Sequence, residues 1–283
     1  MLFATFKTYL ESTYSFTITY IQPLTGGDIN KVYLITTNTV ELVLKLNHAS
    51  AHPLMFEKEA KGLEMLAVTD TFIIPKVIDY GIFEMYGYLL LEYIPSGLKT
   101  SGFWNLFGRQ LALLHQHSSD RFGLEDDNYI GSLPQYNKFT KRASDFLIEQ
   151  RLAPQFKMAK EKGYEFAGMD ALYKKVAVLV PNEPPSLIHG DLWSGNYMVT
   201  QGGLPVLIDP AVAYAPREMD LALMKLFGGF DNSVFSRYQE INPLADQWQD
   251  RILLYQLYYI LVHLNLFGDS YYNRVQTILK KYG

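Results

Sequence analysis

The apolar pattern of this 283-residue chain changes once, at Ile94-Pro95-Ser96-Gly97. Upstream of these four residues, short segments alternate or are rich in β-branched and aromatic residues, as strands are. Downstream, apolar residues recur at the spacing of a helix face. Because proline lacks a backbone donor and glycine is conformationally permissive, we expect no regular element to continue through this segment. The chain therefore divides into a β-rich first part and a helical second part.

The same pattern predicts where the regular elements lie. In the first part we expect one helix, over 55–67, and strands over 17–24, 31–37, 41–46, 77–81 and 88–93. In the second part we expect short extended segments within 187–209 and helices over 103–117, 139–162 and 248–267. This outline is an α+β fold with a small β-rich N-lobe, residues 1–93, and a mostly helical C-lobe, residues 94–283.

Composition and charge narrow the classes of function. The formal net charge is −4, and no cluster of lysine and arginine is present that could follow a phosphate backbone, so no nucleic-acid partner is expected. Cysteine is absent, which excludes disulfides, thiolate metal sites and cysteine nucleophiles and favours a cytoplasmic location. The first 15 residues lack a basic segment followed by a long apolar stretch, so no signal peptide is expected.

The most apolar run of the sequence, 252–267, resembles a membrane span only superficially. It contains Gln256, His263 and Asn265, and it is shorter than the roughly 20 residues that cross a bilayer. We therefore expect a buried core helix here and no membrane partner.

The strongest chemical signal is the segment His189-Gly190-Asp191-Leu192-Trp193-Ser194-Gly195-Asn196. Kinase catalytic loops have the pattern H-x-D-L-x-x-x-N, in which the aspartate accepts the proton of the acceptor hydroxyl and the asparagine holds a magnesium ion. The turn between them lets the base face the acceptor oxygen while the carboxamide faces the phosphates. This predicts Asp191 as the catalytic base and Asn196 as a magnesium ligand. A structural role, bonding the backbone of the loop, fits His189 best.

A second signal lies downstream, where the apolar run Val206-Leu207-Ile208 leads into Asp209-Pro210. A strand that ends in an aspartate can deliver a carboxylate to a cleft, and Mg²⁺ favours a few carboxylates together with phosphate oxygens and water. Taken singly, an Asp-Leu in a loop is usually a turn or a helix cap, and an Ile-Asp-Pro is often a strand end. In this order and at this spacing, the two segments favour catalysis, with Asp209 as the second magnesium ligand.

Two upstream residues complete the expected nucleotide site. Lys45 lies on the strand face opposite Leu44 and Leu46, where a lysine can reach the α- and β-phosphates of ATP. Glu59 lies on the following helix, where it can pair with Lys45 and hold it in place. Surface lysines and glutamates are common, but Lys45 stands in an otherwise apolar strand, which favours the functional interpretation.

Backbone groups are expected to supply the remaining nucleotide contacts. The turn at Gly26, Gly27 and Asp28 would cover the phosphates with N–H groups, although any hairpin can look like this. The connector from Glu92 to Ile94 would bind adenine through its main chain, so the identity of its side chains says little.

In these segments the chain resembles the fructosamine kinases (ketosamine kinases), which are relatives of the aminoglycoside phosphotransferases. Many small-molecule kinases share the catalytic loop, whereas Trp193, the segment from Asn128 to Asn137 and Asp209-Pro210-Ala211 are more particular to this family. The resemblance runs over nearly the whole chain and includes Leu24–Asn30, Leu44–Asn47, Phe56, Glu59-Ala60, Gly62-Leu63, Leu89–Glu92, Phe122-Gly123, Arg151-Leu152, Pro154-Gln155, Arg217-Glu218 and Asp220–Ala222.

The resemblance implies a protein-kinase-like fold of two lobes, with ATP and Mg²⁺ as cofactors. It also implies phosphorylation of the third-carbon hydroxyl of a ketosamine, the sugar adduct that glycation leaves on an amine. The phosphorylated adduct is then unstable and eliminates, which frees the amine. Trp193 and Asn128 would contact this small-molecule substrate, and a cationic amine could lie over the indole face. Packing of Trp193 in the core is an equally good interpretation of that residue.

The chain also departs from its relatives at particular positions. Some relatives carry a cysteine in the phosphate-covering turn that acts as a redox switch, but Asp28 stands in that region here, so this regulation cannot operate. Protein kinases have an arginine where this chain has Gly190, and Pro210 rather than Phe-Gly follows Asp209. Activation by loop phosphorylation and a protein substrate bound in the protein-kinase manner are therefore not expected.

Two other functions remain open at this point. The chain could phosphorylate another small hydroxyl compound, such as an aminoglycoside, choline or a free sugar. It could also be a catalytically silent nucleotide-binding module, although a decayed site usually lacks at least one member of the set that is complete here. The sequence indicates neither the preferred amine or sugar nor the oligomeric state.

Overall fold

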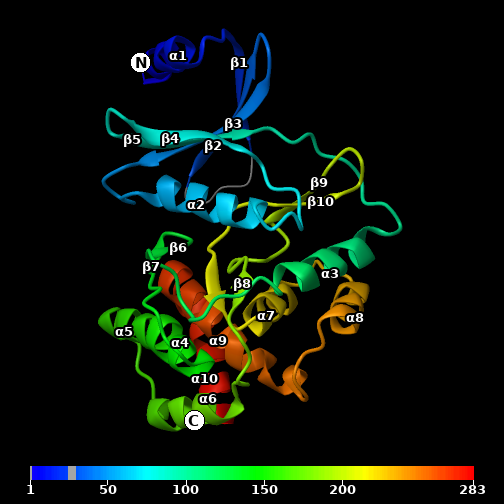
Figure 1. Ribbon diagram of the computed structural model, residues 1–283. Helices are drawn as coiled ribbons and strands as arrows, with labels where there is room; N and C mark the ends of the chain where they lie inside the picture. The colour runs from blue at the N-terminus through cyan, green and yellow to red at the C-terminus, as the bar shows by residue number, and fades with distance from the viewer. Residues whose placement is uncertain (1, 25–29) are drawn as a thin grey trace.

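The computed structural model describes residues 2–24 and 30–283 (Figure 1). A β-rich first part lies above a larger helical part, and the irregular segment 93–102 joins them. The turn at Gly26, Gly27 and Asp28 lies outside the described residues. The α+β architecture with a small β-rich lobe and a helical lobe is confirmed.

The first part is a five-stranded antiparallel sheet with one helix on each face. The strand order is β1-β2-β3-β5-β4, and α2 connects β3 to β4. The elements are α1 (Leu2–Tyr14), β1 (Ile18–Leu24), β2 (Lys31–Thr37), β3 (Glu41–His48), α2 (Met55–Ala67), β4 (Val77–Phe83) and β5 (Tyr86–Glu92).

Alternation along β3 separates the two faces of this sheet, because successive side chains of a strand point to opposite sides. The leucines of β3 are buried against Phe6 and Leu10 of α1. The opposite face packs on α2, where Phe56 and Leu63 contact Leu89 of β5. Lys45 belongs to this second face and is therefore held toward α2, as the sequence predicts.

Helix α1 corrects the sequence prediction, which has a single helix in the first part. Phe6 and Leu10, separated by four residues, form the buried stripe of α1. This stripe is short, and only the sheet beneath it supplies the burial that stabilises the helix.

The second part contains the predicted helices with altered ends. Helix α9 (Trp248–Phe267) has the predicted bounds, whereas α3 (Phe103–Leu114) stops before residue 117. The predicted helix over 139–162 begins only at residue 143, because the backbone of Thr140 exchanges two hydrogen bonds with Phe122 in an extended conformation. It then continues as α4 (Ala143–Phe146), a π-helical turn (Leu147–Leu152) and α5 (Ala153–Glu161).

The other elements of the second part lie between and after these helices. The additional helices are α6 (Met169–Leu179), α7 (Glu218–Phe227), α8 (Asn232–Ile241), a 3₁₀ turn (Asp269–Tyr271) and α10 (Tyr272–Tyr282). The short strands are β6 (Asn128–Ile130), β7 (Leu133–Gln135), β8 (Ser186–Ile188), β9 (Tyr197–Val199), β10 (Pro205–Leu207) and β11 (Ala213–Ala215).

Helix α9 is the centre of the second part and packs against α5, α7 and α10. Tyr255, Tyr258 and Tyr259 are buried along it, so α9 is the core helix that the sequence predicts. Within the described residues, no helix combines the length and the apolar character that crossing a membrane requires.

Two short antiparallel ladders, β8 with β11 and β9 with β10, hold the loops that carry the predicted chemistry. Strand β8 ends directly before His189, and β10 ends shortly before Asp209. The Leu207 N–H donates to the Ile73 carbonyl at 3.1 Å, which fixes the second ladder to the first part of the chain. Both loops therefore lie where the two parts meet.

Candidate active site

Five side chains that the sequence singles out come together at the boundary between the two parts. Lys45 comes from β3 and Glu59 from α2, while Asp191, Asn196 and Asp209 come from the loops after β8 and β10. All but Lys45 line one cavity of about 870 Å³. The Lys45 ammonium bonds two of the lining carboxylates, so it belongs to the same site.

Lys45 is a buried cation between two carboxylates. Its ammonium group donates to Glu59 Oε1 at 2.6 Å and to Asp209 Oδ1. Burial disfavours the charged amine, but Asp209 and Glu59 outweigh burial and raise the pKa of Lys45 above its ordinary value. Lys45 is therefore charged at physiological pH and joins the first part of the chain to the second.

The loop from Asp191 to Asn196 is closed by bonds between its two functional residues. The Asn196 carboxamide N–H donates to Asp191 Oδ2 at 3.0 Å and to the Asp191 carbonyl at 2.9 Å. Backbone bonds link Trp193 N–H to the Asp191 carbonyl and Asn196 N–H to the Trp193 carbonyl, at 3.1 and 3.0 Å. The loop therefore holds the carboxylate and the carboxamide at a set separation.

Asp191 has the electrostatic surroundings of a general base. Burial, followed by the negative charge of Asp209, raises the pKa of Asp191 to about 7, while the Asn196 hydrogen bond opposes the shift. A base whose pKa lies near the working pH is ionised in a useful fraction and still accepts a proton readily.

The backbone at Gly190 and Asp209 restricts which residues can occupy these two positions. Gly190 has φ of +83°, and a Cβ at this position would lie 2.0 Å from the Ala211 carbonyl oxygen. Asp209 has φ of +54°, which is uncommon for a residue with a side chain. The Ala211 N–H donates to the His189 carbonyl at 2.9 Å and joins the two loops. The arginine that protein kinases have at the Gly190 position could not fit here.

His189 supports the loop backbone, as predicted. It is fully buried, and burial lowers its pKa, so the imidazole is neutral. Its Nδ1 accepts the Asp191 N–H at 3.3 Å, which leaves Nε2 to donate to the Ile208 carbonyl at 2.9 Å.

A buried carboxylate that the sequence does not single out as a site residue supports the loop from below. Asp220, in the first turn of α7, accepts the backbone N–H groups of His189 and Gly190 at 2.8 and 2.9 Å. His115 Nε2 lies 3.2 Å from Asp220 Oδ2, and His115 Nδ1 lies 2.9 Å from the Tyr238 hydroxyl. The only sequence signal for Asp220 is its match to the family pattern.

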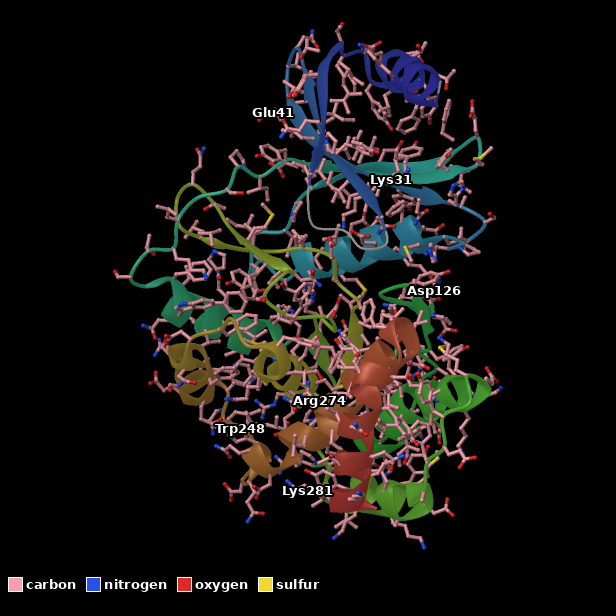
Figure 2. All side chains as sticks on the ribbon, turned by 180° about the vertical axis from the view of Figure 1, so that it is seen from behind. Lys31, Glu41, Asp126, Trp248, Arg274 and Lys281 are labelled. Atoms are coloured by element: carbon pink, nitrogen blue, oxygen red, sulfur yellow. The ribbon has the colours of Figure 1, made fainter. Side chains whose placement is uncertain are left out.

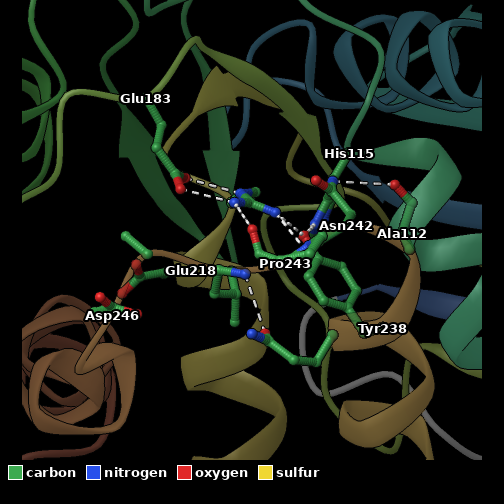
Figure 3. A network of polar contacts seen from close by, with 12 residues as sticks. Ala112, His115, Glu183, Glu218, Tyr238, Asn242, Pro243 and Asp246 are labelled. Atoms are coloured by element: carbon green, nitrogen blue, oxygen red, sulfur yellow. Dashed lines mark hydrogen bonds and ion pairs between the residues drawn. The ribbon is translucent and has the colours of Figure 1, made fainter.

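Through His115 and Tyr238, Asp220 is connected to a larger polar network (Figure 3). The Arg217 guanidinium donates to both carboxylate oxygens of Glu183, at 2.8 and 2.7 Å, and to the carbonyls of Asn242 and Pro243. The Tyr238 hydroxyl lies between Arg217 and His115. The network fixes the start of α7, and with it the position of Asp220.

The donor set fits magnesium. The Asp209 side chain is 40% exposed, and Asn196 Oδ1 accepts no hydrogen bond from the described residues, so both can offer oxygen to a cation. Mg²⁺ is usually bound by one or two carboxylates together with substrate phosphates and water. Within residues 2–24 and 30–283, no group of three or more His, Cys, Asp or Glu side chains could hold a metal, so nucleotide and water would have to complete the coordination.

Comparison with known proteins identifies the family of this chain. Residues 4–282 match the family model described as fructosamine kinase. The chain belongs to the fructosamine kinase family. It is 39% identical to "Probable ketoamine kinase slr1563" of Synechocystis sp. over 91% of this chain and 88% of the relative. It is also 39% identical to a "Probable ketoamine kinase" of Lactiplantibacillus plantarum over 98% and 99% of the two chains.

Solved structures show which fold this chain shares. A candidate fructosamine-3-kinase from Haemophilus somnus superposes with a TM-score of 0.89 at 29% identity, over 98% of this chain and 96% of that one. The aminoglycoside phosphotransferase APH(4)-Ia superposes with a TM-score of 0.65 at 14% identity, over 99% of both chains, which shows a shared fold. The fold is thus protein-kinase-like, and the family makes the chain an ATP-dependent phosphotransferase.

Trp193 of this fructosamine kinase family member lies in the wall of the cavity. Its side chain is 41% exposed, so packing in the core does not describe it. The indole meets the Phe227 ring edge-on at 6.5 Å and covers Gly195, where a Cβ would lie 2.4 Å from the indole. Trp193 therefore offers aromatic surface beside Asp191.

Asn128 also lines the cavity, but its amide is engaged with the protein. Its N–H donates to the Val212 carbonyl at 2.9 Å, and its Oδ1 accepts from Gln135 and Asn137 at 2.8 and 2.9 Å. The side chain is buried. These bonds favour a role in holding neighbouring segments over a polar contact to substrate.

The connector residues of the kinase lie at the end of β5. Glu92 is exposed, its N–H donates to the Lys76 carbonyl at 2.9 Å, and its carboxylate accepts the Lys76 N–H at 3.2 Å. The Tyr93 N–H donates to the Glu41 carbonyl at 3.3 Å. Ile94 is half-buried. These bonds hold the start of the connector against β3 and against the residue that precedes β4.

Proposed function

We propose that this kinase transfers the γ-phosphoryl group of ATP to a sugar hydroxyl of ketosamines, the fructosamine- or ribulosamine-type adducts of glycation. The observation that carries the proposal is the meeting of a carboxylate of pKa about 7, Asp191, with the Lys45–Asp209 ion pair at one cavity. The family and the names of the relatives support the substrate class. Phosphorylation of the third-carbon hydroxyl would make the adduct eliminate and release the amine.

We assign the nucleotide to the first lobe, residues 1–93, and the acceptor to the second, residues 94–283. Lys45, held by Glu59, would neutralise the α- and β-phosphates. The main chain from Glu92 to Ile94 would bind adenine. The turn at Gly26, Gly27 and Asp28 would cover the phosphates.

The reaction needs little covalent help from the protein, because phosphoryl transfer has a loose transition state. The acceptor oxygen bonds to the γ-phosphorus, the bond between that phosphorus and the bridging oxygen of ADP breaks, and Asp191 takes the hydroxyl proton. Asn196 and Asp209 would hold Mg²⁺, which supplies neutralisation of the phosphate charge when bound. The bond from Asn196 to Asp191 orients the base, and Lys45 stays protonated throughout.

We assign Trp193 to the acceptor site, where its ring would pack against the sugar or the amine substituent. A cationic amine over an indole face is stabilised by the ring quadrupole. Asn128 would support the acceptor site indirectly, by holding the segments to which it is hydrogen-bonded. Because the sequence contains no cysteine, we also propose a cytoplasmic location.

The test is product analysis with purified protein, ATP, Mg²⁺ and a panel of acceptors. Fructosyl-lysine and ribulosyl-lysine should consume ATP, and NMR should place the phosphate on the third carbon of the sugar. Aminoglycosides, choline and free sugars serve as competitors. Preferred turnover of any competitor would overturn the substrate assignment, and no turnover with any acceptor would indicate a silent nucleotide-binding module.

A further inference from the structure

The hairpin formed by β6 and β7, with its flanking residues 126–137, contacts α2, which carries Glu59. The Lys61 ammonium lies 3.0 Å from Asp126 Oδ2, and Lys58 donates to the Asp127 carbonyl. The Tyr129 hydroxyl donates to the Pro53 carbonyl at 3.0 Å, just before α2. Figure 2 shows Asp126 at the level where α2 meets the second part of the chain.

The same hairpin holds the segment that follows Asp209. Asn128 donates to the Val212 carbonyl at 2.9 Å, and Gln135 donates to the Ala211 carbonyl at 3.0 Å. These carbonyls lie two and three residues after Asp209, whose positive φ makes its backbone dependent on its surroundings. Two buried amides therefore hold the turn that presents the Asp209 carboxylate.

The orientation of these amides is set by bonds from behind. Asn128 Oδ1 accepts two N–H groups, from Gln135 and Asn137, so its own N–H must face Val212. The Tyr258 hydroxyl donates to Gln135 Oε1 at 2.7 Å, which likewise directs the Gln135 N–H groups away from α9. Flipping either amide would place like groups against each other.

Arg151 anchors this chain of bonds. It is 1% exposed, and within residues 2–24 and 30–283 no carboxylate forms an ion pair with it, so burial lowers its pKa. It donates to Asn137 Oδ1 at 2.8 Å and to the Tyr136 carbonyl, and its guanidinium lies 4.4 Å from the centre of the Phe146 ring. A buried charge without an ion partner is costly, and its position in a π-helical turn is typical of functional sites.

We propose that Asn128 and Gln135 are positioning residues for Asp209, anchored by Arg151 through Asn137. They hold the turn after Asp209 in the arrangement that binds Mg²⁺ together with a nucleotide. None of the four side chains needs to contact the metal. The proposal rests on the proposed function, because it takes Asp209 as a metal ligand.

The test is the magnesium dependence of nucleotide binding, measured by titration calorimetry with the ATP analogue AMP-PNP. Wild type is compared with Asn128→Ala and Gln135→Met, in millimolar Mg²⁺ and in EDTA. Each variant loses one hydrogen bond to the turn, to the Val212 carbonyl or to the Ala211 carbonyl. Loss of that bond is expected to weaken affinity in Mg²⁺ by about threefold to tenfold and to leave affinity in EDTA unchanged. The matched control is Gln155→Met, because Gln155 is an equally buried amide that bonds Asn265 and no residue of the hairpin or turn.

Melting curves of every variant accompany the titrations, and Arg151→Lys replaces any hairpin variant that fails to fold. A merely structural role would lower the melting temperature of the hairpin variants and of Gln155→Met alike and leave the magnesium dependence unmoved, which would refute the proposal. A wild type without magnesium-dependent nucleotide binding would instead refute the proposed function.

Discussion

Asp191 lies half-buried beside a second carboxylate, and its pKa of about 7 brings its titration into the physiological range. Only the ionised form can accept the hydroxyl proton, so kcat/KM should rise with pH up to about 7 and level off above it. The measurement is a profile of kcat/KM from pH 5.5 to 9, at saturating Mg²⁺. Full activity at pH 5.5 would show that Asp191 is not the base.

The raised pKa of Asp191 also predicts how the stability of the protein changes with pH. The folded-state pKa of Asp191 lies above the ordinary value of 3.8, so the stability linked to its proton is complete below pH 4 and is lost as pH rises through about 7. Asp191→Asn removes this titration, and the variant should therefore melt at a higher temperature than wild type at pH 8. Melting curves at pH 4, 6 and 8 check the trend. A gap that does not widen with pH would contradict the assigned pKa.

At this scale, the sequence predicts residues whose partners lie nearby in the chain. Asp191 and Asn196 belong to one turn, and the turn itself dictates their bond. The roles of Asp220 and Arg151 could not be predicted in this way, because both act through buried hydrogen bonds to segments that are distant in the sequence. Nothing in the spacing of polar residues distinguishes a buried carboxylate that accepts backbone N–H groups from a solvated one.

At the scale of elements, the junction of the two site loops depends on Gly190. Gly190→Ala combines an unfavourable φ with a Cβ 2.0 Å from the Ala211 carbonyl oxygen. Gly163 provides a matched control, since its φ is +92° but no atom of the described residues lies within 4 Å of where a Cβ would be. We expect Gly163→Ala to cost about 1–2 kcal/mol and to keep activity, and Gly190→Ala to cost clearly more and to lose activity. Equal unfolding free energies in urea would contradict the account.

Helix α9 and the segment before α4 show why some elements are predictable and others are not. From Ile252 onward α9 is mostly apolar, so its pattern predicts a long helix that ends at Phe267. Phe139 lies at helical spacing before Ala143 and Phe146, which favours an earlier start of the helix. The backbone of Thr140 nevertheless pairs with Phe122, and this long-range pairing overrides the local preference. The docking of the β6–β7 hairpin is likewise a tertiary event without a local signature.

At the scale of the whole molecule, the buried Lys45 joins the two lobes through its ion pair with Asp209 and is held within the first lobe by Glu59. Lys45→Met leaves the Glu59 carboxylate buried without a partner, which should cost about 3–5 kcal/mol of unfolding free energy. Lys45→Met combined with Glu59→Gln should recover part of this loss. Urea unfolding at pH 8 measures both, with Arg237→Met as the control for an exposed pair, expected to cost less than about 1 kcal/mol. Additive losses would show that the pair is not coupled.

The two-lobed outline could be predicted from the sequence, because apolar residues recur at strand spacing in the first lobe and at helix spacing in the second. How the two lobes meet could be predicted only in part, from the short motifs that now lie on either side of the cavity. Lys45 and Asp209 are 164 positions apart, and the expectation that both serve one nucleotide came from their chemistry. The structure adds the contact between them.

The central claim is that Asp191 serves as base at a nucleotide site built by Lys45 and Asp209. The most direct measurement compares ketosamine phosphorylation and nucleotide affinity for Asp191→Asn and Asp209→Asn. We predict that Asp191→Asn lowers kcat by about 100-fold to 10,000-fold with little change in the affinity for ATP, whereas Asp209→Asn also weakens binding of ATP in Mg²⁺. Turnover at the wild-type rate by Asp191→Asn would contradict the account.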